Sequence, residues 1–175
     1  MNNKITLIIT WIALIGLGIF TIREHYNKPK MAFISIQETY NRFELRKELE
    51  TKFIAVKNIR QKVLDSLIVD LQILAKKTEE EKGKNKIWEN LYNKKQEEFS
   101  IRSQNYKDQN AQLSKEYDQE ILSQLNQYIS DYGKENNFQY IFGNDGNGLL
   151  MHADSCFNVT NRVIEYINEK YKGKK

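Results

Sequence analysis

The sequence has little of what compact enzymes use to make turns and cross-links. Its 175 residues include one proline, Pro29, one cysteine, Cys156, and eight glycines. A single cysteine excludes an intramolecular disulfide and any zinc site built on a pair of cysteines. With few proline and glycine residues the chain has few places to turn sharply, so we expect long uninterrupted helices.

A strong charge of one sign is also missing from most of the chain. The net charge is +4, and residues 1–30 hold three of those charges, since four basic side chains there are balanced only by Glu24. The other 145 residues carry 23 basic and 22 acidic side chains and are close to neutral. Nucleic-acid binding proteins concentrate positive charge on their folded part. The composition therefore argues against a nucleic-acid partner.

The one long hydrophobic run lies near the N-terminus. The run from Ile5 to Ile22 carries no charge. Its length of 18 residues is just enough for a helix to cross a bilayer. The run is longer than the apolar core of a usual signal peptide, and no A-x-A cleavage site follows it. We expect residues 1–30 to form a membrane anchor with its linker. A signal segment that is cleaved off remains the alternative.

The middle of the chain predicts a strand followed by two long helices. Residues 31–37, MAFISIQ, are typical of a short buried strand. Residues 38–132 contain no proline and only one glycine, Gly83, in the polar stretch KKTEEEKGKNK. On both sides of Gly83 apolar residues recur at steps of 3, 4 or 7, which indicates amphipathic helices.

Folding the chain back near Gly83 brings the two apolar stripes into register. Residues whose numbers add up to 166 then lie level, and Arg60 faces Tyr106, where a cation–π contact is possible. We therefore predict a long antiparallel helical hairpin, or arm, over residues 38–132. The expected seam contains Leu45, Leu49, Phe53, Leu67, Leu74, Tyr92, Phe99, Leu113, Tyr117 and Ile121.

The C-terminal part, residues 133–175, predicts a β-hairpin and a helix. The runs FQYIF (138–142) and GLLMH (148–152) flank an Asp-Gly pair, which is a hairpin signal. The segment NVTNRVIEYINEKY then has the apolar spacing of a terminal helix. The fold class is therefore α+β, a small three-stranded sheet body carrying a long coiled-coil arm.

The polar residues near the C-terminus do not predict catalysis. His152, Asp154 and Cys156 lie two apart and would share one face of an extended strand, whereas a nucleophile and its base must converge. One His, one Asp and one Cys also lack the fourth ligand of a structural zinc site. We expect no catalytic residues, no metal and no cofactor, and we expect that the protein is not an enzyme.

The two ends of this pattern resemble the Skp/OmpH family. The opening MAFISIQETYNRFELRKELETKF resembles the family's first strand and arm helix. The closing YGKENNFQYIFGNDGNGLLMHADSCFNVTNRVIEYINEKY resembles its "GYDYIL" strand, Gly-rich turn, "YAD" strand end and "DITDEVI" helix. The chain departs from the family where Ser35 replaces a frequent Asp and His152 a frequent Tyr.

The resemblance implies an ATP-independent holdase chaperone that binds unfolded outer-membrane proteins in the periplasm. Such proteins are homotrimers shaped like a jellyfish, so the implied partners are the clients and two further copies of the chain. If residues 5–22 are retained, the protein is tethered to the inner membrane; if they are cleaved, it is free in the periplasm. The implied trimer body uses Phe33, Ile34, Ile36, Tyr140, Ile141 and Phe142.

A structural role is the competing hypothesis. A membrane-anchored coiled coil that spaces or scaffolds envelope complexes needs only the anchor and the helices. It gives no reason for the terminal sheet, so removing residues 133–175 distinguishes the two hypotheses. A rod tolerates that truncation, whereas a trimer joined through its sheets falls apart into single chains.

Overall fold

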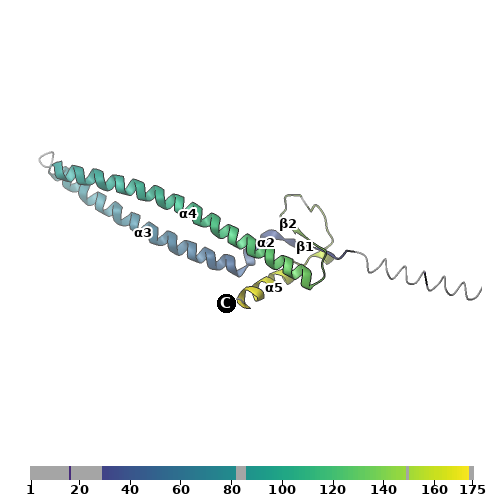
Figure 1. The fold of residues 1–175 in the computed structure, drawn as a ribbon. Helices are drawn as coiled ribbons and strands as arrows, with labels where there is room; N and C mark the ends of the chain where they lie inside the picture. The colour runs from purple at the N-terminus through teal and green to yellow at the C-terminus, as the bar shows by residue number, and fades with distance from the viewer. Residues whose placement is uncertain (1–15, 17–28, 82–85, 149, 174–175) are drawn as a thin grey trace, which may run out of the picture.

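The computed structural model describes residues 29–81, 86–148 and 150–173, together with Gly16. A long pair of helices projects from a small base that holds both strands and the C-terminal helix (Figure 1). The predicted membrane segment, residues 5–22, lies outside the described residues except for Gly16. Within the described ranges, no helix has both the length and the apolar character needed to span a bilayer.

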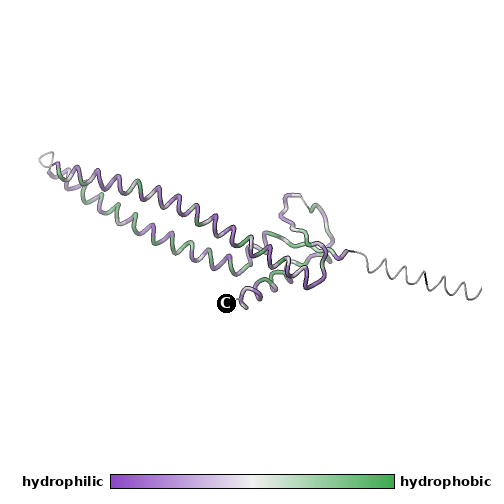
Figure 2. Tube along the Cα trace, viewed as in Figure 1, coloured by the Kyte–Doolittle hydropathy of each residue, from purple (hydrophilic) through white to green (hydrophobic). Residues whose placement is uncertain are grey.

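The arm is the antiparallel pair of helices that the sequence predicts. Helix α3 (Glu44–Glu80) runs outward for 37 residues and α4 (Lys86–Glu135) returns over 50 residues. At 1.5 Å per residue these helices are about 55 and 75 Å long. Hydrophobic positions recur along both of them (Figure 2). Gly83, the predicted point of reversal, lies outside the described residues, but the helices on either side confirm the hairpin.

The outgoing half of the arm is broken near its root. Helix α2 (Ile36–Arg42) precedes α3, and the two are separated by Phe43, whose backbone is extended with φ −73° and ψ 129°. The Phe43 side chain is fully buried and packs edge-on against Tyr128 and Tyr171. The chain therefore leaves the helical path at Phe43 so that this ring can enter the core of the base.

The first strand is shorter than the predicted range, residues 31–37. Strand β1 covers Met31–Ser35, and α2 begins at Ile36. The reason is local, since Ser35 Oγ accepts a hydrogen bond from the Glu38 N–H at 3.2 Å and caps the helix.

The predicted C-terminal β-hairpin is wrong. Strand β2 (Tyr140–Asn144) pairs with β1 in parallel, Met31 opposite Tyr140 and Ser35 opposite Asn144. After β2 the Asn144 and Asp145 side chains accept hydrogen bonds from the backbone N–H groups of Gly146 and Asn147, and residues 151–154 form no strand. The described sheet has two strands rather than three, and the whole arm is the crossover that a parallel pair requires.

The core of the protein lies in the base. Helix α5 (Thr160–Gly173) packs against the end of α4, the sheet and the α2–α3 break. The core is formed by Ala32, Ile34, Phe43, Leu45, Leu49, Ile121, Leu125, Tyr128, Tyr132, Val159, Val163 and Ile167. Because α4 runs unbroken from the arm into this core, it is the rigid connection between the arm and the base.

Candidate functional site

The seam of the arm holds the side chains that the sequence places there. Leu45, Leu49, Leu67, Leu74 and Ile121 are buried. The other expected members are half-buried, namely Phe53, Tyr92, Phe99, Leu113 and Tyr117. Such a seam explains how the arm holds together, while any part its members take in binding stays a prediction.

Two polar layers interrupt the seam in the outer part of the arm. Arg60 of α3 donates a hydrogen bond to Asn110 Oδ1 of α4, and its Cζ lies 5.7 Å from the centre of the Tyr106 ring. The predicted contact between Arg60 and Tyr106 is thus confirmed. Farther out, Lys95 Nζ lies 3.6 Å from Asp70 Oδ2 across the seam and 3.1 Å from Glu98 Oε2 on its own helix.

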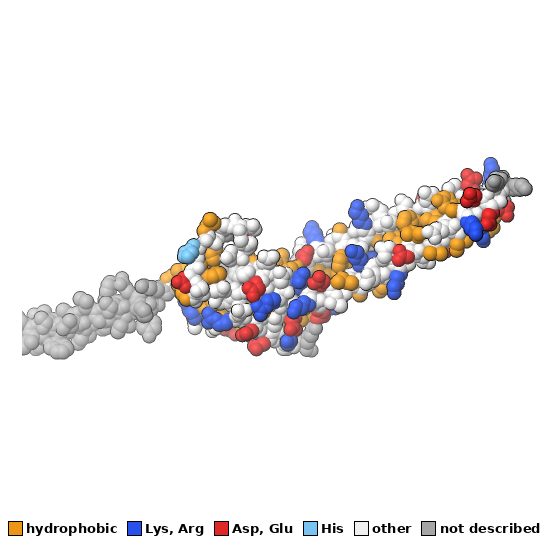
Figure 3. Space-filling model, turned by 180° about the vertical axis from the view of Figure 1, so that it is seen from behind, with side chains coloured by type: hydrophobic (Ala, Val, Ile, Leu, Met, Phe, Trp, Pro, Cys, Tyr) orange, Lys and Arg blue, Asp and Glu red, His pale blue; other side chains and the backbone are white. Residues whose placement is uncertain are grey.

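Both helices also carry large apolar side chains that face solvent. Along α3 and α4 these exposed residues are Ile54, Ile59, Ile68, Val69, Ile73, Ile87, Leu91, Ile101 and Leu122. On the face drawn in Figure 3, hydrophobic side chains follow the arm between groups of both charges. These outward side chains do not contribute to the seam between the two helices. The arm therefore exposes an elongated surface of mixed apolar and charged character to solvent.

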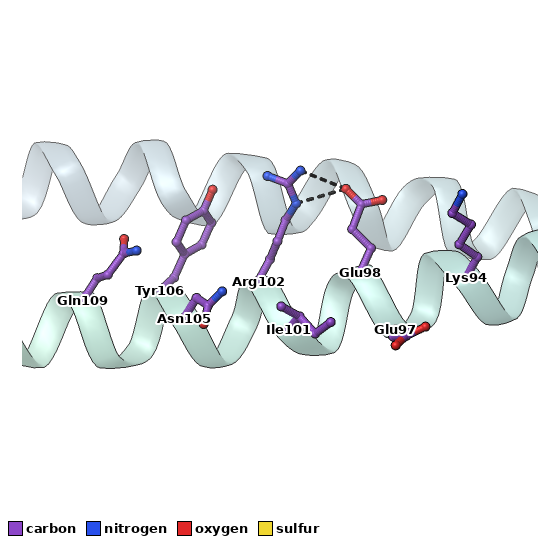
Figure 4. A pocket seen from close by; sticks show the side chains of 8 residues that line it. All are labelled: Lys94, Glu97, Glu98, Ile101, Arg102, Asn105, Tyr106 and Gln109. Carbon is purple, nitrogen blue, oxygen red and sulfur yellow. Dashed lines mark hydrogen bonds and ion pairs between the residues drawn. The ribbon is translucent and has the colours of Figure 1, made fainter.

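A shallow groove runs along one flank of α4. It is lined by Lys94, Glu97, Glu98, Ile101, Arg102, Asn105, Tyr106 and Gln109. In Figure 4 the side chains of Glu98, Arg102 and Tyr106 rise from α4 toward α3, and Ile101 lies beside them. Arg102 Nη2 lies 3.0 Å from Glu98 Oε1. The groove thus presents one exposed isoleucine among fixed charges and side-chain amides.

The electrostatics of this groove come from its ion pairs. The hydrogen bond from Lys95, and after it the one from Arg102, lowers the pKa of the Glu98 carboxyl below its ordinary value. The hydrogen bond with Tyr106, and after it the one with Glu98, raises the pKa of Arg102. Both groups therefore stay charged at neutral pH, and neither supplies a proton donor or acceptor tuned to chemistry near pH 7.

The six residues predicted for the trimer body are near one another in the base but do not share one surface. Ile34 is buried in the core, and Phe33 and Ile141 are half-buried. Tyr140 and Phe142 are exposed and stack on each other, with ring centres 6.0 Å apart. Ile36 lies on α2 rather than on the strand. Its side chain occupies the space that a Cβ on Gly143 would need.

An exposed apolar groove lies on one face of the sheet, and the sequence prediction found only part of it. Its lining residues are Met31, Ala32, Phe33, Phe142, Leu150, His152, Ala153, Asp154 and Phe157. Met31, Phe142 and Phe157 are each between 44 and 49% exposed. Met31 lies two residues before Phe33 on β1, so the two side chains share one face of the strand and the period of two would have identified Met31. Phe157 comes from a single short 3-10 turn, residues 155–157, where no periodicity could identify it.

Two of the three polar residues near the C-terminus, Asp154 and Cys156, contact each other in a local helix cap. Asp154 caps the short 3-10 helix η1 (Ser155–Phe157) by accepting a hydrogen bond from the Cys156 N–H at 2.9 Å. Hydrogen bonding to the Asp154 carboxylate raises the pKa of the Cys156 thiol above its ordinary value. A thiol held in its protonated form is a poor nucleophile.

Comparisons with known proteins agree with this architecture. The family model described as outer membrane protein (OmpH-like) matches residues 30–167. The chain is also similar to the crystal structure of a candidate outer membrane chaperone (OmpH-like) from Caulobacter crescentus CB15. The TM-score is 0.71 at 11% sequence identity, over 82% of this chain and 86% of that one. At this identity the likeness establishes the shared fold. No curated protein matches the sequence.

Proposed function

Because the chain belongs to the OmpH-like outer membrane protein family, we propose that it is an ATP-independent holdase that binds unfolded outer-membrane proteins in the cell envelope. The family is one of chaperones and not of enzymes. The observation that carries the proposal is the row of outward apolar residues along an arm whose seam is formed by other side chains.

The proposed mechanism is weak contact repeated over a long surface. An unfolded β-barrel protein exposes short apolar segments separated by polar ones. Exposed isoleucines at intervals along the arm, with charged side chains between them, suit such a chain without requiring a deep pocket. Several weak contacts made together hold a client firmly, yet each breaks readily, so release needs no nucleotide.

We further propose that the active form is a homotrimer joined through the base. The groove around Met31, Phe142 and Phe157 and the edges of a two-stranded sheet support this proposal, because both are costly to leave in water. A periplasmic location, with residues 5–22 as an uncleaved tether to the inner membrane or as a cleaved signal, completes the proposal.

The test is suppression of client aggregation. A urea-unfolded outer-membrane β-barrel protein is diluted into buffer with the purified chain, and light scattering is followed. We expect scattering to be suppressed at one trimer per client, without ATP. Full aggregation at that ratio would contradict the holdase proposal and favour the structural tether, for which no interaction with unfolded proteins is expected.

A pair of variants assigns the effect to the arm. Replacing Ile59, Ile73 and Ile101 together by Ser should weaken suppression several-fold without loss of helicity, since all three side chains are more than half exposed. Met151→Ser, at an 86% exposed position of the base, is the control and should suppress aggregation like the wild type.

A further inference from the structure

Three cations contact the opposite helix of the arm at one common register. Lys77 Nζ lies 4.6 Å from the centre of the Trp88 ring, Lys95 Nζ 3.6 Å from Asp70 Oδ2, and Arg60 Cζ 5.7 Å from the centre of the Tyr106 ring. The residue numbers of each pair add up to 165 or 166. These contacts span about half of the arm, so they report a single alignment of α3 against α4.

Beyond the base, the apolar part of the seam does not by itself select this alignment. Its residues recur about every seven positions, so sliding one helix by a heptad again places apolar residues opposite one another. Leu67, which is level with Phe99 in the observed register, would then face Tyr92 or Tyr106. In coiled coils such degeneracy is resolved by a few polar residues within the seam.

The sequence of the turn does not select the alignment either. Residues 76–86, KKTEEEKGKNK, contain no proline and one glycine. Apart from the glycine, all residue types in this stretch are tolerated in a helix. The turn could therefore move along the sequence, with one helix becoming longer and the other shorter. The position of the reversal is therefore decided by packing: at the root by the shared core, where Leu45 and Leu49 lie with Ile121 and Leu125, and farther out by the contacts along the arm.

Each neighbouring register leaves a cation of the arm in an unfavourable place, although one slide also brings Asp70 level with Arg102 and the other brings Arg60 level with Glu98. A slide of one heptad in one direction places Lys77 opposite Lys95 and Arg60 opposite Leu113. A slide in the other direction places Lys95 against Val63 and Leu64. Like charges repel, and a charge placed among apolar groups without a partner is costly.

We infer that Arg60, Asp70, Lys95 and Asn110 hold the outer part of the arm in the register that the base sets at the root, and thereby fix where the chain reverses. Half-buried polar layers of this kind stabilise the fold less than apolar residues at the same positions would, but they favour one alignment over the others. This inference concerns the arm itself and holds whether or not the holdase proposal does.

The consequence is an arm of defined length. A slide of one heptad shifts α3 against α4 by about 10 Å along the axis, at 1.5 Å per residue, and moves the turn by half of that. It also displaces the exposed isoleucines of α3 relative to those of α4. Register selection therefore keeps the outer surface of every copy the same.

Distance measurement between spin labels tests the inference. In a Cys156→Ser background of the full chain, Asn58→Cys and Asn93→Cys place labels at exposed positions about 22 Å apart along the arm axis, at 1.5 Å per residue. Labelled chains are diluted with unlabelled ones, so that only distances within a chain are recorded. The wild-type seam should give one narrow distance distribution.

The variant that removes the polar layers carries leucine at positions 60, 70, 95 and 110. We expect it to melt at the same or a higher temperature and to show a second population displaced by about 10 Å. A single population at the wild-type distance would overturn the inference. A clear fall in melting temperature or helicity would overturn it as well, since the layers would then serve stability.

A swapped pair is the matched control. The double variant Arg60→Asn with Asn110→Arg keeps an arginine and an asparagine in the same layer on exchanged helices. It should retain one narrow distance population. A second population in this variant would show that the polar layer does not select the register, and would contradict the inference independently of the leucine variant.

Discussion

Among single residues, Gly143 is placed where a side chain cannot fit without movement. A Cβ built on Gly143 would lie 2.8 Å from Cγ1 of Ile36, and it would contact Cδ1 of the same side chain even more closely. We expect Gly143→Ala to lower the free energy of unfolding by about 1–3 kcal/mol, the usual cost of overpacking. Urea unfolding followed by circular dichroism measures it.

The contact with Ile36 can be separated from any other effect at Gly143. Ile36→Ala removes both close atoms, so Gly143→Ala should cost much less in that background. Gly173→Ala is the control, because a Cβ added there, at the end of α5, would have nothing within 4 Å of it. An equal loss in both backgrounds would show that Ile36 is not the obstacle.

At Ser35 the sequence carries two conflicting signals, one for a strand and one for the start of a helix. The β-rich run MAFISIQ predicts a strand through residue 37, yet SIQE at positions 35–38 is also a helix-capping pattern. The structure follows the cap, with the Ser35 hydroxyl accepting from the Glu38 N–H. Thr39 Oγ1 also donates to the Ser35 carbonyl at 2.7 Å. The boundary was therefore predictable from four residues.

At the scale of elements, Asn168 of α5 joins three helices. Its Oδ1 accepts a hydrogen bond from the Glu44 N–H at 2.9 Å, and its Nδ2 donates to the Arg42 carbonyl at 3.1 Å. Phe43, the N-cap of α3, offers no side-chain cap of its own. A single amide from a distant element thus satisfies the backbone on both sides of the α2–α3 break.

Asn168→Ala should therefore destabilise the protein by about 1 kcal/mol, the typical cost of a lost helix cap. The measurement is the midpoint of urea unfolding. Asn168→Asp keeps the acceptor for the Glu44 N–H but loses the donor, so its loss should be smaller. If Asn168→Ala unfolds at the wild-type midpoint, α5 does not stabilise the root of the arm.

The ion pairs of α4 make the arm weakly sensitive to acid. Lys95 first, and then Arg102, lowers the pKa of Glu98 from its ordinary value of 4.5. A carboxyl with a lowered folded-state pKa stabilises the fold above that ordinary value, and this contribution is lost as the pH falls through the lowered one. Glu98→Gln should therefore melt modestly below the wild type at pH 7, and the difference should shrink as the pH falls below 4.5.

Thermal melts at several pH values check this expectation, with the neighbouring exposed Glu97→Gln as the control. The difference should also shrink in high salt, which screens exposed charges. A Glu98→Gln difference that stays constant between pH 7 and pH 3 would assign the effect to packing and not to charge.

The long helices could be predicted from sequence, whereas the sheet could not, and the reason is the range of the interactions. Each arm helix is encoded in a local period, and contacts such as Arg60 with Tyr106 then follow from simple counting. Strand β2 pairs with a strand more than a hundred residues earlier. The Asp145–Gly146 pair favours a local hairpin, and nothing in the two strands themselves shows that the whole arm separates the true partners.

The same limit applied to the candidate site. The seam residues could be named because helical spacing identifies a buried stripe. The apolar groove of the base could not, because Leu150 reaches it from a bend and Phe157 from the one-turn helix η1, and neither has a period that the sequence could reveal. Ile36 was assigned to the strand and lies on α2, so its predicted place in the body depended on a boundary that sequence periodicity does not fix.

For the molecule as a whole, the distribution of burial separates two tasks. The core lies in the base, where α5 and the end of α4 cover one side of the sheet. The arm has only a seam, and the outer part of that seam contains polar layers. In a protein organised in this way the base provides the stable core, and the arm provides a long exposed surface for contacts with other molecules. This division suits an elongated binding protein.

The other side of the sheet gives the last prediction, which concerns assembly. Met31, Phe142 and Phe157 are exposed around an apolar groove of a two-stranded sheet. A sheet this small rarely leaves such a face in water. The double variant Phe142→Asp with Phe157→Asp should convert the proposed trimer to single chains, because association would then bury two unpaired carboxylates per subunit.

The measurement is molar mass in solution by sedimentation, with circular dichroism as the check on folding. Both side chains are about half exposed in the single chain, so the variant should keep its helicity while it loses its partners. Ile59→Asp, on the outside of the arm, is the control and should leave the mass unchanged. A double variant with the wild-type mass would place the subunit contact elsewhere, since no interface could accept those carboxylates in an apolar groove without cost.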